Sequence, residues 1–179
     1  MNIGRKIVLL GFAMAMVTIV GCARQSVTEA VAVVHPTQGS QCHGTVRFTK
    51  VSSGVRIVAD IEGLQPNTRH AFHVHQYGDE TATNGKSAGG HYNPEKMAHG
   101  RPTDAIRHAG DFGNIKADVG GEAHYERVDT RISIAGGRNP ILGRAVIIHA
   151  GEDKFVQPTG GAGARVGIGI IGIAKAGTP

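Results

Sequence analysis

The residues of this chain best suited to chemistry are histidines gathered in one stretch. Five of the ten histidines fall within residues 73–111 of the 179-residue chain. Imidazole is the commonest metal ligand in proteins, and histidine-rich sites suit zinc and copper better than calcium or magnesium. The candidate ligands, with the carboxylate that closes the stretch, are His73, His75, His91, His99, His108 and Asp111. The stretch therefore predicts a metal centre.

Two of these histidines have the spacing of neighbours on one face of a β-strand. His73 and His75 flank Val74, and a strand turns alternate side chains to the same face. Their Cα atoms would lie roughly 6.5 to 7 Å apart, a gap that two inclined imidazole rings can close onto one ion. A lone His-x-His pair in a strand is usually accidental, so the prediction depends on the ligands that follow.

The other ligands fall in or next to a long segment rich in glycine and proline, residues 78–110. A loop of this length with few apolar side chains cannot be held by burial alone. His91, His99, His108 and Asp111 offer an alternative, because three nitrogens and one carboxylate oxygen complete a tetrahedral zinc shell. A histidine in a glycine-rich loop is more often solvated than ligating, but six candidate ligands in one segment favour the metal centre.

Two later residues extend this centre. His149 ends an apolar strand expected at residues 144–150. It is either a third nitrogen for the ion held by the histidine pair or a histidine satisfied by hydrogen bonds. Arg165 opens the final strand straight after a glycine-rich loop at residues 151–163. It is either a surface charge or the group that receives a small anion.

The elements that must position these residues are β-strands. Apolar and polar residues alternate in short runs separated by glycine, proline and serine, as in half-buried strands. No long window after residue 21 has a convincing helical period. Expected strands lie near residues 31–35, 45–49, 55–62, 70–76, 115–119, 122–127, 130–134, 144–150 and 165–174. Eight or nine short strands predict an all-β, antiparallel sandwich or barrel.

The amino terminus has the pattern of an export signal rather than of a folded element. Arg5 and Lys6 precede fourteen uncharged residues at 7–20, too short a run for a spanning helix. Gly21 and Cys22 then resemble the lipobox of bacterial lipoproteins, with an ordinary signal peptide and an incidental cysteine as the alternative. Diacylation of Cys22 would supply the two chains that stable anchoring requires. The expected product is exported, periplasmic or otherwise extracytoplasmic, and anchored in a membrane.

The expected organisation is a signal peptide at residues 1–21, a lipidated tether at 22–29 and one domain at 30–179. Without the signal, seventeen basic residues oppose fourteen acidic ones, a net charge of +3. This charge is mild and evenly interspersed, so no nucleic acid is expected as a partner. Acylation of Cys22 would leave Cys42 without an internal disulfide partner. Cys42 is then either a free thiol or an intermolecular contact.

The chain resembles the copper/zinc superoxide dismutase family, in its eukaryotic-like type that lacks a long insertion after His75. The resemblance covers residues 27–176. It rests on AFHVHQYG at 71–78, SAGGHYNP at 87–94, His99 and Gly100, HAGDFG at 108–113, GRAVIIH at 143–149 and GAGARVGIGIIG at 161–172. It implies an eight-stranded antiparallel Greek-key barrel or sandwich in which two long loops form the metal site.

The resemblance also implies roles for individual residues. It assigns copper to His73, His75, His91 and His149, and zinc to His91, His99, His108 and Asp111. His91 would thus bridge both ions, and Asp153 matches a carboxylate that hydrogen-bonds one ligand of each. The implied activity is superoxide dismutase, in which copper is alternately reduced and oxidised, His91 carries a proton and Arg165 docks the superoxide anion.

Two other functions are weighed against this one. A copper-binding or copper-delivery protein of the same fold would bind copper without turnover, and a structural lipoprotein would hold no metal. Related copper-chaperone domains tend to lack part of the copper site, whereas all four matching histidines are present here. The dismutase is therefore the leading hypothesis.

The chain departs from the family pattern in three places. Gly85 and Ile168 occupy the positions of the family disulfide, so we expect loop order, and the stability of the protein, to depend unusually on metal. The loop at 151–163 is several residues shorter than in eukaryotic enzymes, which puts fast guidance of the substrate in doubt. Ala71 replaces a glycine, a change without an interpretation.

A homodimer is expected, because contacts of eukaryotic-type dimers match Leu142, Gly143, Ile171 and Ile173.

Overall fold

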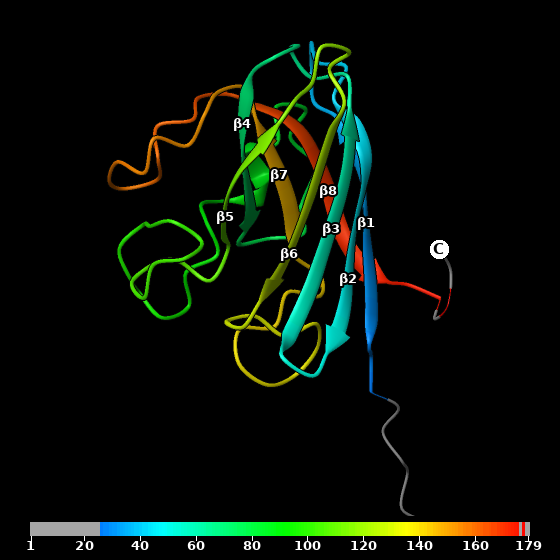
Figure 1. Cartoon of the computed structure of the whole chain (residues 1–179), viewed down its shortest axis with the longest axis vertical. Helices are drawn as coiled ribbons and strands as arrows, with labels where there is room; N and C mark the ends of the chain where they lie inside the picture. The colour runs from blue at the N-terminus through cyan, green and yellow to red at the C-terminus, as the bar shows by residue number, and fades with distance from the viewer. Residues whose placement is uncertain (1–25, 176, 178–179) are drawn as a thin grey trace, which may run out of the picture.

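Eight β-strands make up the fold in a computed structural model that describes residues 26–175 and 177 (Figure 1). The predicted signal peptide and Cys22 lie outside these residues. The strands are β1 (Glu29–Pro36), β2 (His43–Val51), β3 (Gly54–Glu62), β4 (Arg69–His75), β5 (Asp111–Lys116), β6 (Ala123–Asp129), β7 (Ala145–His149) and β8 (Arg165–Ile173). A 3₁₀ turn, η1 (Lys86–Ala88), is the one helical element of the described part. Among the described residues, no helix is long and apolar enough to cross a bilayer.

The strands follow one another around the sheet in the order β5-β4-β7-β8-β1-β2-β3-β6, with every neighbouring pair antiparallel. The neighbours β4 and β7, β8 and β1, and β3 and β6 are not consecutive in the chain, which is a Greek-key crossover pattern. Between the end strands, Tyr125 on β6 donates a hydrogen bond to the Phe112 carbonyl on β5 at 2.9 Å. The barrel is nearly closed, and the predicted eight-stranded antiparallel barrel is confirmed.

The barrel interior is filled by the apolar side chains that alternate with polar ones along the strands. The buried face of β3 consists of Val55, Ile57, Ala59 and Ile61. Phe72 on β4 lies at the centre, and its ring packs edge-on against Phe112 and Tyr125 at centroid distances of 5.3 and 5.2 Å. Such ring pairs stabilise the fold beyond the effect of the apolar area that they bury. Truncation of a buried Phe typically costs about 3–5 kcal/mol. The core therefore fixes β4 as a rigid platform.

β4 and β7 are buried on both faces, and this is what positions the site. Val146 and Ile148 point into the main core, whereas Ala145 and Ile147 belong to a second apolar cluster outside the barrel. In the ladder, His73 pairs with Ile147 and His75 with Ala145. The two histidines therefore lie on the outer face of the barrel wall, with Ala145 and Ile147. The long loops at 76–110 and 150–164 project from the side of the barrel where β4 and β5 lie (Figure 1).

The strand predicted at residues 130–134 is wrong. Ile132 and Ile134 do alternate and are buried, which is why the pattern resembles a strand. Their backbone bonds locally instead, because the Ser133 N–H donates to the Asn139 carbonyl at 3.2 Å and Ser133 makes only an isolated bridge, to Pro140. The segment caps the end of the barrel as an irregular loop.

The strand predicted at residues 115–119 is displaced toward the amino terminus. β5 already begins at Asp111 and ends at Lys116. The carboxylate of Asp118 accepts backbone hydrogen bonds from Gly120 at 2.8 Å and Glu122 at 3.0 Å, which closes a turn. Val119 at the tip of that turn is 81% exposed. Asp111 is therefore a strand residue rather than a loop residue.

Cys42 is a free thiol buried inside the barrel. A Cβ added to Gly167 would lie 2.7 Å from its Sγ atom, so the thiol packs directly on the backbone of β8. Burial raises the pKa of the thiol to about 12, and the thiol rather than the reactive thiolate is present at neutral pH. Of the two alternatives for Cys42, the structure favours the free thiol over the intermolecular contact.

Candidate metal centre

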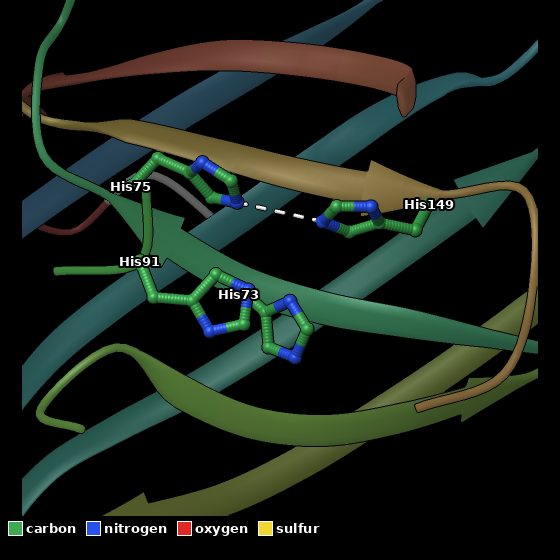
Figure 2. Close-up of side chains that lie close together, drawn as sticks. All are labelled: His73, His75, His91 and His149. Carbon is green, nitrogen blue, oxygen red and sulfur yellow. Dashed lines mark hydrogen bonds between the residues drawn. The ribbon is translucent and has the colours of Figure 1, made fainter. Parts of the chain in front are cut away.

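The predicted ligands come together on the outer face of β4 and β7. One buried group is His73, His75, His91 and His149 (Figure 2). A second is His91, His99, His108 and Asp111, and a third is His73, His99 and Asp153. Within each group the candidate ligand atoms all lie within 4.8 Å of one another, close enough to share an ion. His91 belongs to both four-membered groups.

Backbone pairing places His91, although it lies in a loop. His75 and His91 form an isolated antiparallel bridge, and the Tyr92 N–H donates to the Val74 carbonyl at 2.8 Å. β4 is itself held between β5 and β7. The His91 ring lies 4.0 Å from the His73 ring, centroid to centroid. This isolated β-bridge thus holds the shared ligand, His91, against β4.

The tautomers of His75 and His149 leave two lone pairs facing each other. Nδ1 of His75 donates to the Gly89 carbonyl at 2.9 Å, and Nδ1 of His149 lies 3.3 Å from the Gly163 carbonyl. With the proton on Nδ1, the lone pair of a neutral imidazole is on Nε2. The two Nε2 atoms are 3.4 Å apart (Figure 2). Facing lone pairs repel unless a cation lies between them, so the pair fits a metal ion.

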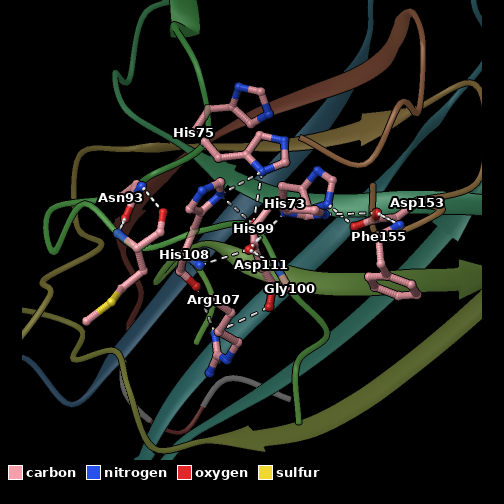
Figure 3. Close-up of polar contacts among 12 residues, drawn as sticks. His73, His75, Asn93, His99, Gly100, Arg107, His108, Asp111, Asp153 and Phe155 are labelled. Carbon is pink, nitrogen blue, oxygen red and sulfur yellow. Dashed lines mark hydrogen bonds and ion pairs between the residues drawn. The ribbon is translucent and has the colours of Figure 1, made fainter. Parts of the chain in front are cut away.

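Asp153 connects the two four-membered groups. It accepts hydrogen bonds from Nε2 of His73 and from Nε2 of His99, both at 2.9 Å (Figure 3). The opposite nitrogens, Nδ1 of His73 and Nδ1 of His99, are buried and make no hydrogen bond. A buried polar atom without a partner requires an explanation. A lone pair directed from each ring into a ligand group is the donor that a metal ion requires.

Asp111 gathers the nitrogens of the second group. Its Oδ1 atom lies 2.9 Å from Nδ1 of His91 and 3.1 Å from Nδ1 of His108, and Oδ2 lies 2.9 Å from Nδ1 of His99. The contact to His99 is close but lacks hydrogen-bond geometry, as expected of two ligands aimed at one ion. Ligands about 2.0–2.2 Å from one tetrahedral zinc ion stand roughly 3.3–3.5 Å apart. The donor set fits zinc after a small expansion.

Burial holds three histidines of the first group, His75, His91 and His149, neutral. Burial, followed by the charge of His73, lowers the pKa of His91 to about 4 and that of His149 to about 3. Burial, followed by the charge of His91, lowers the pKa of His75 well below its ordinary value. Neutral imidazole is the ligating form. Each of these three rings therefore presents an unprotonated nitrogen at neutral pH.

The nearby carboxylates raise the pKa of His99, whereas the pKa values of His75, His91 and His149 are lowered. Burial lowers the pKa of His99, but the adjacent carboxylates of Asp111 and Asp153 outweigh burial and raise it to about 9. Burial raises the pKa of each carboxyl group, yet the histidines hold both well below their usual range. Metal-free protein thus keeps a proton on His99, and a bound cation would replace its charge.

The two groups differ in their access to solvent. A cavity of about 470 Å³ has His75, His91 and His149 in its wall, together with Lys86 and Arg165. In the second group only the shared His91 reaches this cavity. A site open to solvent can take a substrate, whereas a closed four-ligand site is typical of a structural metal.

Arg165 joins the cavity to the long loop. One guanidinium nitrogen donates to the Gly85 carbonyl and the other donates to the Gly89 carbonyl at 2.5 Å. Burial lowers the pKa of Arg165, but a guanidinium stays charged in proteins. Gly85 is one of the two positions that lack the expected disulfide, and Ile168, the other, packs in the cluster that contains Ala88. Hydrogen bonds and packing tie the loop where the disulfide would be.

Some residues that build this centre were not predicted. The side chain of Asn114 bonds the backbone of Asp153 at 2.7 and 3.0 Å. A Cβ added to Gly160 would lie 2.0 Å from Oδ1 of Asp153, so only glycine fits there. Nδ1 of His70 lies 2.8 Å from the His149 carbonyl. Of these residues only His70 could have been noticed in the sequence, because it lies on the same strand as His73 and His75. The contacts of Asn114 and Gly160 join segments that are distant in the sequence.

Comparison with known proteins gives one consistent result. The family model described as copper/zinc superoxide dismutase matches residues 42–171. The chain is 42% identical over 181 residues to a Cu-Zn superoxide dismutase of Paramecium bursaria Chlorella virus 1, covering 96% of this chain and 95% of that protein. It is 43% identical over 156 residues to the Cu-Zn superoxide dismutase of Schizosaccharomyces pombe, covering 82% and 98%. An extracellular Cu-Zn superoxide dismutase of Brugia pahangi is 41% identical over 164 residues, covering 84% and 80%.

Proposed function

This chain belongs to the copper/zinc superoxide dismutase family, and we propose that its two histidine groups divide the two metals between them. The protein is a superoxide dismutase that converts two superoxide anions and two protons to dioxygen and hydrogen peroxide. In this proposal the open group, His73, His75, His91 and His149, holds copper. The closed group, His91, His99, His108 and Asp111, holds zinc. The observation that carries the assignment is that His91 belongs to both groups, while of the unshared ligands only His75 and His149, in the first group, line the cavity.

The chemistry of each group supports this division. Bound copper supplies one-electron oxidation and reduction, and zinc supplies a charge that is redox-silent. Four nitrogens suit Cu(II), whereas three nitrogens and a carboxylate suit zinc. Two adjacent dications favour loss of both ring protons from His91, because each nitrogen then ligates one ion. Burial lowers the pKa of His91 to about 4, so the first of these protons is already absent at neutral pH, and the two cations would account for loss of the second.

The residues of the chain then have separate tasks in the reaction. Nε2 of His91, the ring nitrogen that does not face Asp111, would hold copper in this proposal and, when it is not ligating, would hold a proton for the reduced oxygen species. Nδ1 of His91 stays in the closed group beside Asp111, which fixes the ring. Arg165 positions the superoxide anion at the cavity. Asp153 holds the rings of His73 and His99 in their ligating orientations by accepting both Nε2 protons.

Metal analysis by mass, combined with a superoxide-decay assay, tests this function. Loaded wild-type protein should carry both metals and accelerate decay, and the double variant His73→Ala/His149→Ala should lose copper and activity. The matched control is His43→Ala/His124→Ala, which removes two exposed histidines. Copper binding without decay in the wild type would instead indicate a copper-delivery protein, and no bound metal would indicate a structural lipoprotein.

We also propose that the protein is exported and lipid-anchored. The supporting pattern is Arg5 and Lys6, the uncharged run at 7–20, and Cys22 directly after Gly21. The first strand of the described residues, β1, begins at Glu29, so the tether at 22–29 would hold the domain close to the membrane. Mass spectrometry of the membrane fraction should find a diacylated amino terminus that Cys22→Ala abolishes. Release of unmodified protein in soluble form would contradict the anchor.

A homodimer is the third proposal, and exposed apolar side chains support it. Val33, Tyr77 and Ile173 are 50%, 59% and 66% exposed, and Val33 and Ile173 lie on the paired strands β1 and β8. Of the predicted contacts, Ile171 has its side chain buried in the core instead. Light scattering should find a dimer that Ile173→Glu converts to a monomer. A monomeric wild-type protein would contradict the proposal.

A further inference from the structure

The cavity over the open histidine group has an unusual balance of charge. Two permanent cations, Lys86 and Arg165, line it, and none of its described lining residues is acidic. They come from different segments of the chain, because Lys86 belongs to the first long loop and Arg165 follows the second. A concave site lined by charges of one sign concentrates ions of the opposite sign and raises their rate of arrival.

The second loop contributes no charge to this cavity. The part of its wall that comes from residues 159–164 consists of threonine, glycine and alanine. Lys154, the basic residue of that loop, does not line the cavity. Attraction of an anion must therefore come from Arg165 and from the first loop, where Lys86 lies.

We propose that Lys86 is a substrate-guiding residue, which draws superoxide into the cavity and acts together with Arg165. This inference rests on the proposed function. Arg165 is half-buried and lies beside the histidines, where it positions the anion. Lys86 is exposed, so its charge extends into solvent at the cavity rim and acts on the anion before it arrives.

The backbone of Lys86 is held by the same contacts that hold Arg165. Lys86 begins η1, and its N–H donates to the side-chain oxygen of Asn84 at 3.1 Å. The residues on either side of the turn, Gly85 and Gly89, accept hydrogen bonds from the Arg165 guanidinium. The two cations therefore share one frame, and the position of the Lys86 backbone relative to Arg165 is fixed.

No carboxylate neutralises Lys86 in the described part of the chain. None of the ion pairs found there includes Lys86, whereas several arginines do have acidic partners. The carboxylate of Asp79, in the same loop, accepts hydrogen bonds from the N–H and hydroxyl of Thr81 at 2.9 and 2.7 Å. The charge of Lys86 is therefore available to an incoming anion.

The second-order rate constant for superoxide decay, measured against ionic strength with both metals bound, tests the proposal. Lys86→Gln should lower it about two- to fivefold at low salt, and Lys86→Glu should lower it further. Lys86→Arg should retain the wild-type rate. The differences should shrink toward none as the Debye length falls from about 30 Å at 0.01 M to about 3 Å at 1 M. Lys116→Gln is the matched control, because Lys116 is exposed at the end of β5 and lies outside the cavity wall.

Titration with azide, a stable monovalent anion, gives a second readout from the copper absorption spectrum. Lys86→Gln should weaken azide binding by a similar factor, again only at low salt. A Lys86→Gln rate equal to that of Lys116→Gln at low salt would overturn the proposal. So would a loss that salt does not reduce and Lys86→Arg does not rescue, because that pattern indicates a structural role. Inactivity of the loaded wild type would instead refute the proposed function.

Discussion

The side chain of Gln157 clamps the backbone of His99. Its Oε1 atom accepts a hydrogen bond from the His99 N–H at 3.1 Å, and its Nε2 atom donates to the His99 carbonyl at 2.8 Å. The neighbouring Phe155 ring stacks on the His99 imidazole at a centroid distance of 6.3 Å and an interplanar angle of 16°. The shortened second loop thus holds a proposed zinc ligand of the first loop from two sides.

Loss of this clamp should loosen zinc. Gln157→Ala removes two hydrogen bonds and leaves the His99 backbone groups without partners, at a cost of about 1–3 kcal/mol. We expect zinc affinity to fall about tenfold or more, with copper affinity less affected. Chelator competition measures both affinities. Gln65→Ala, in an exposed turn, is the control, and equal zinc affinity of the two variants would show that the clamp has no role in metal binding.

The carboxylate of Asp153 should support both metals. Asp153→Asn keeps the shape but supplies only one acceptor oxygen for the two Nε2–H groups of His73 and His99, and its amide opposes the other. Loss of such a supporting group typically costs about 10–100-fold in metal affinity. We expect copper and zinc both to bind more weakly. Asp60→Asn, at an exposed ion pair with His124, should change neither, and unchanged affinities in Asp153→Asn would contradict the bridging role.

The stability of the metal-free protein should be greatest near pH 6.5, the ordinary pKa of an unfolded histidine. The pKa values of His91 and His149 are lowered to about 4 and about 3. Below pH 6.5 the unfolded chain therefore binds more protons, and the free energy of unfolding falls as the pH falls. The pKa of His99 is raised to about 9, so its stabilisation is present below pH 6.5 and is lost as the pH rises through 9.

Urea unfolding of the metal-free protein at three pH values tests this maximum. The free energy of unfolding should be lower both near pH 4.5 and near pH 9 than at pH 6.5. In His149→Ala the free energy of unfolding should fall less between pH 6.5 and pH 4.5 than in the wild type, and its fall between pH 6.5 and pH 9 should be unchanged. A free energy that rises steadily from acid to alkaline pH would show that the histidine groups do not titrate as their surroundings require.

Removal of metal should destabilise this protein strongly. The loop at 76–110 has hydrogen bonds from Arg165 and a small apolar cluster where the family has a disulfide. If metal binding contributes about 5 kcal/mol, removal should lower Tm by about 10–20 °C in a domain of this size. Calorimetry with and without chelator measures the shift. A shift of only a few degrees would mean that packing and hydrogen bonds alone order the loop.

The sequence predicted the ligand strand and the barrel because both depend on local patterns. Alternation alone put His73 and His75 on one face, and the ladder to β7 shows that face to be the outer one. The same alternation failed at Ile132 and Ile134, where two buried side chains lie in an irregular loop. A pattern of period two reports burial of alternate residues, and it does not report where the backbone hydrogen bonds go.

The contacts that complete the centre could not be predicted in this way. Gln157 and His99 are 58 residues apart, and a glutamine in a loop has no pattern that indicates its partner. The place of Lys86 at the cavity rim likewise follows from η1 and from the hydrogen bonds of Arg165, which are tertiary contacts. Local sequence indicated which residues could ligate, and the fold determined which residues support them.

In the proposed centre one imidazole ring, that of His91, is shared between two metal ions. A crystal structure of the oxidised protein loaded with copper and zinc tests it most directly. We predict copper at about 2.0–2.1 Å from Nε2 and zinc at the same distance from Nδ1. A His91 ring bound to one ion only, with water or another residue completing the second site, would contradict the account.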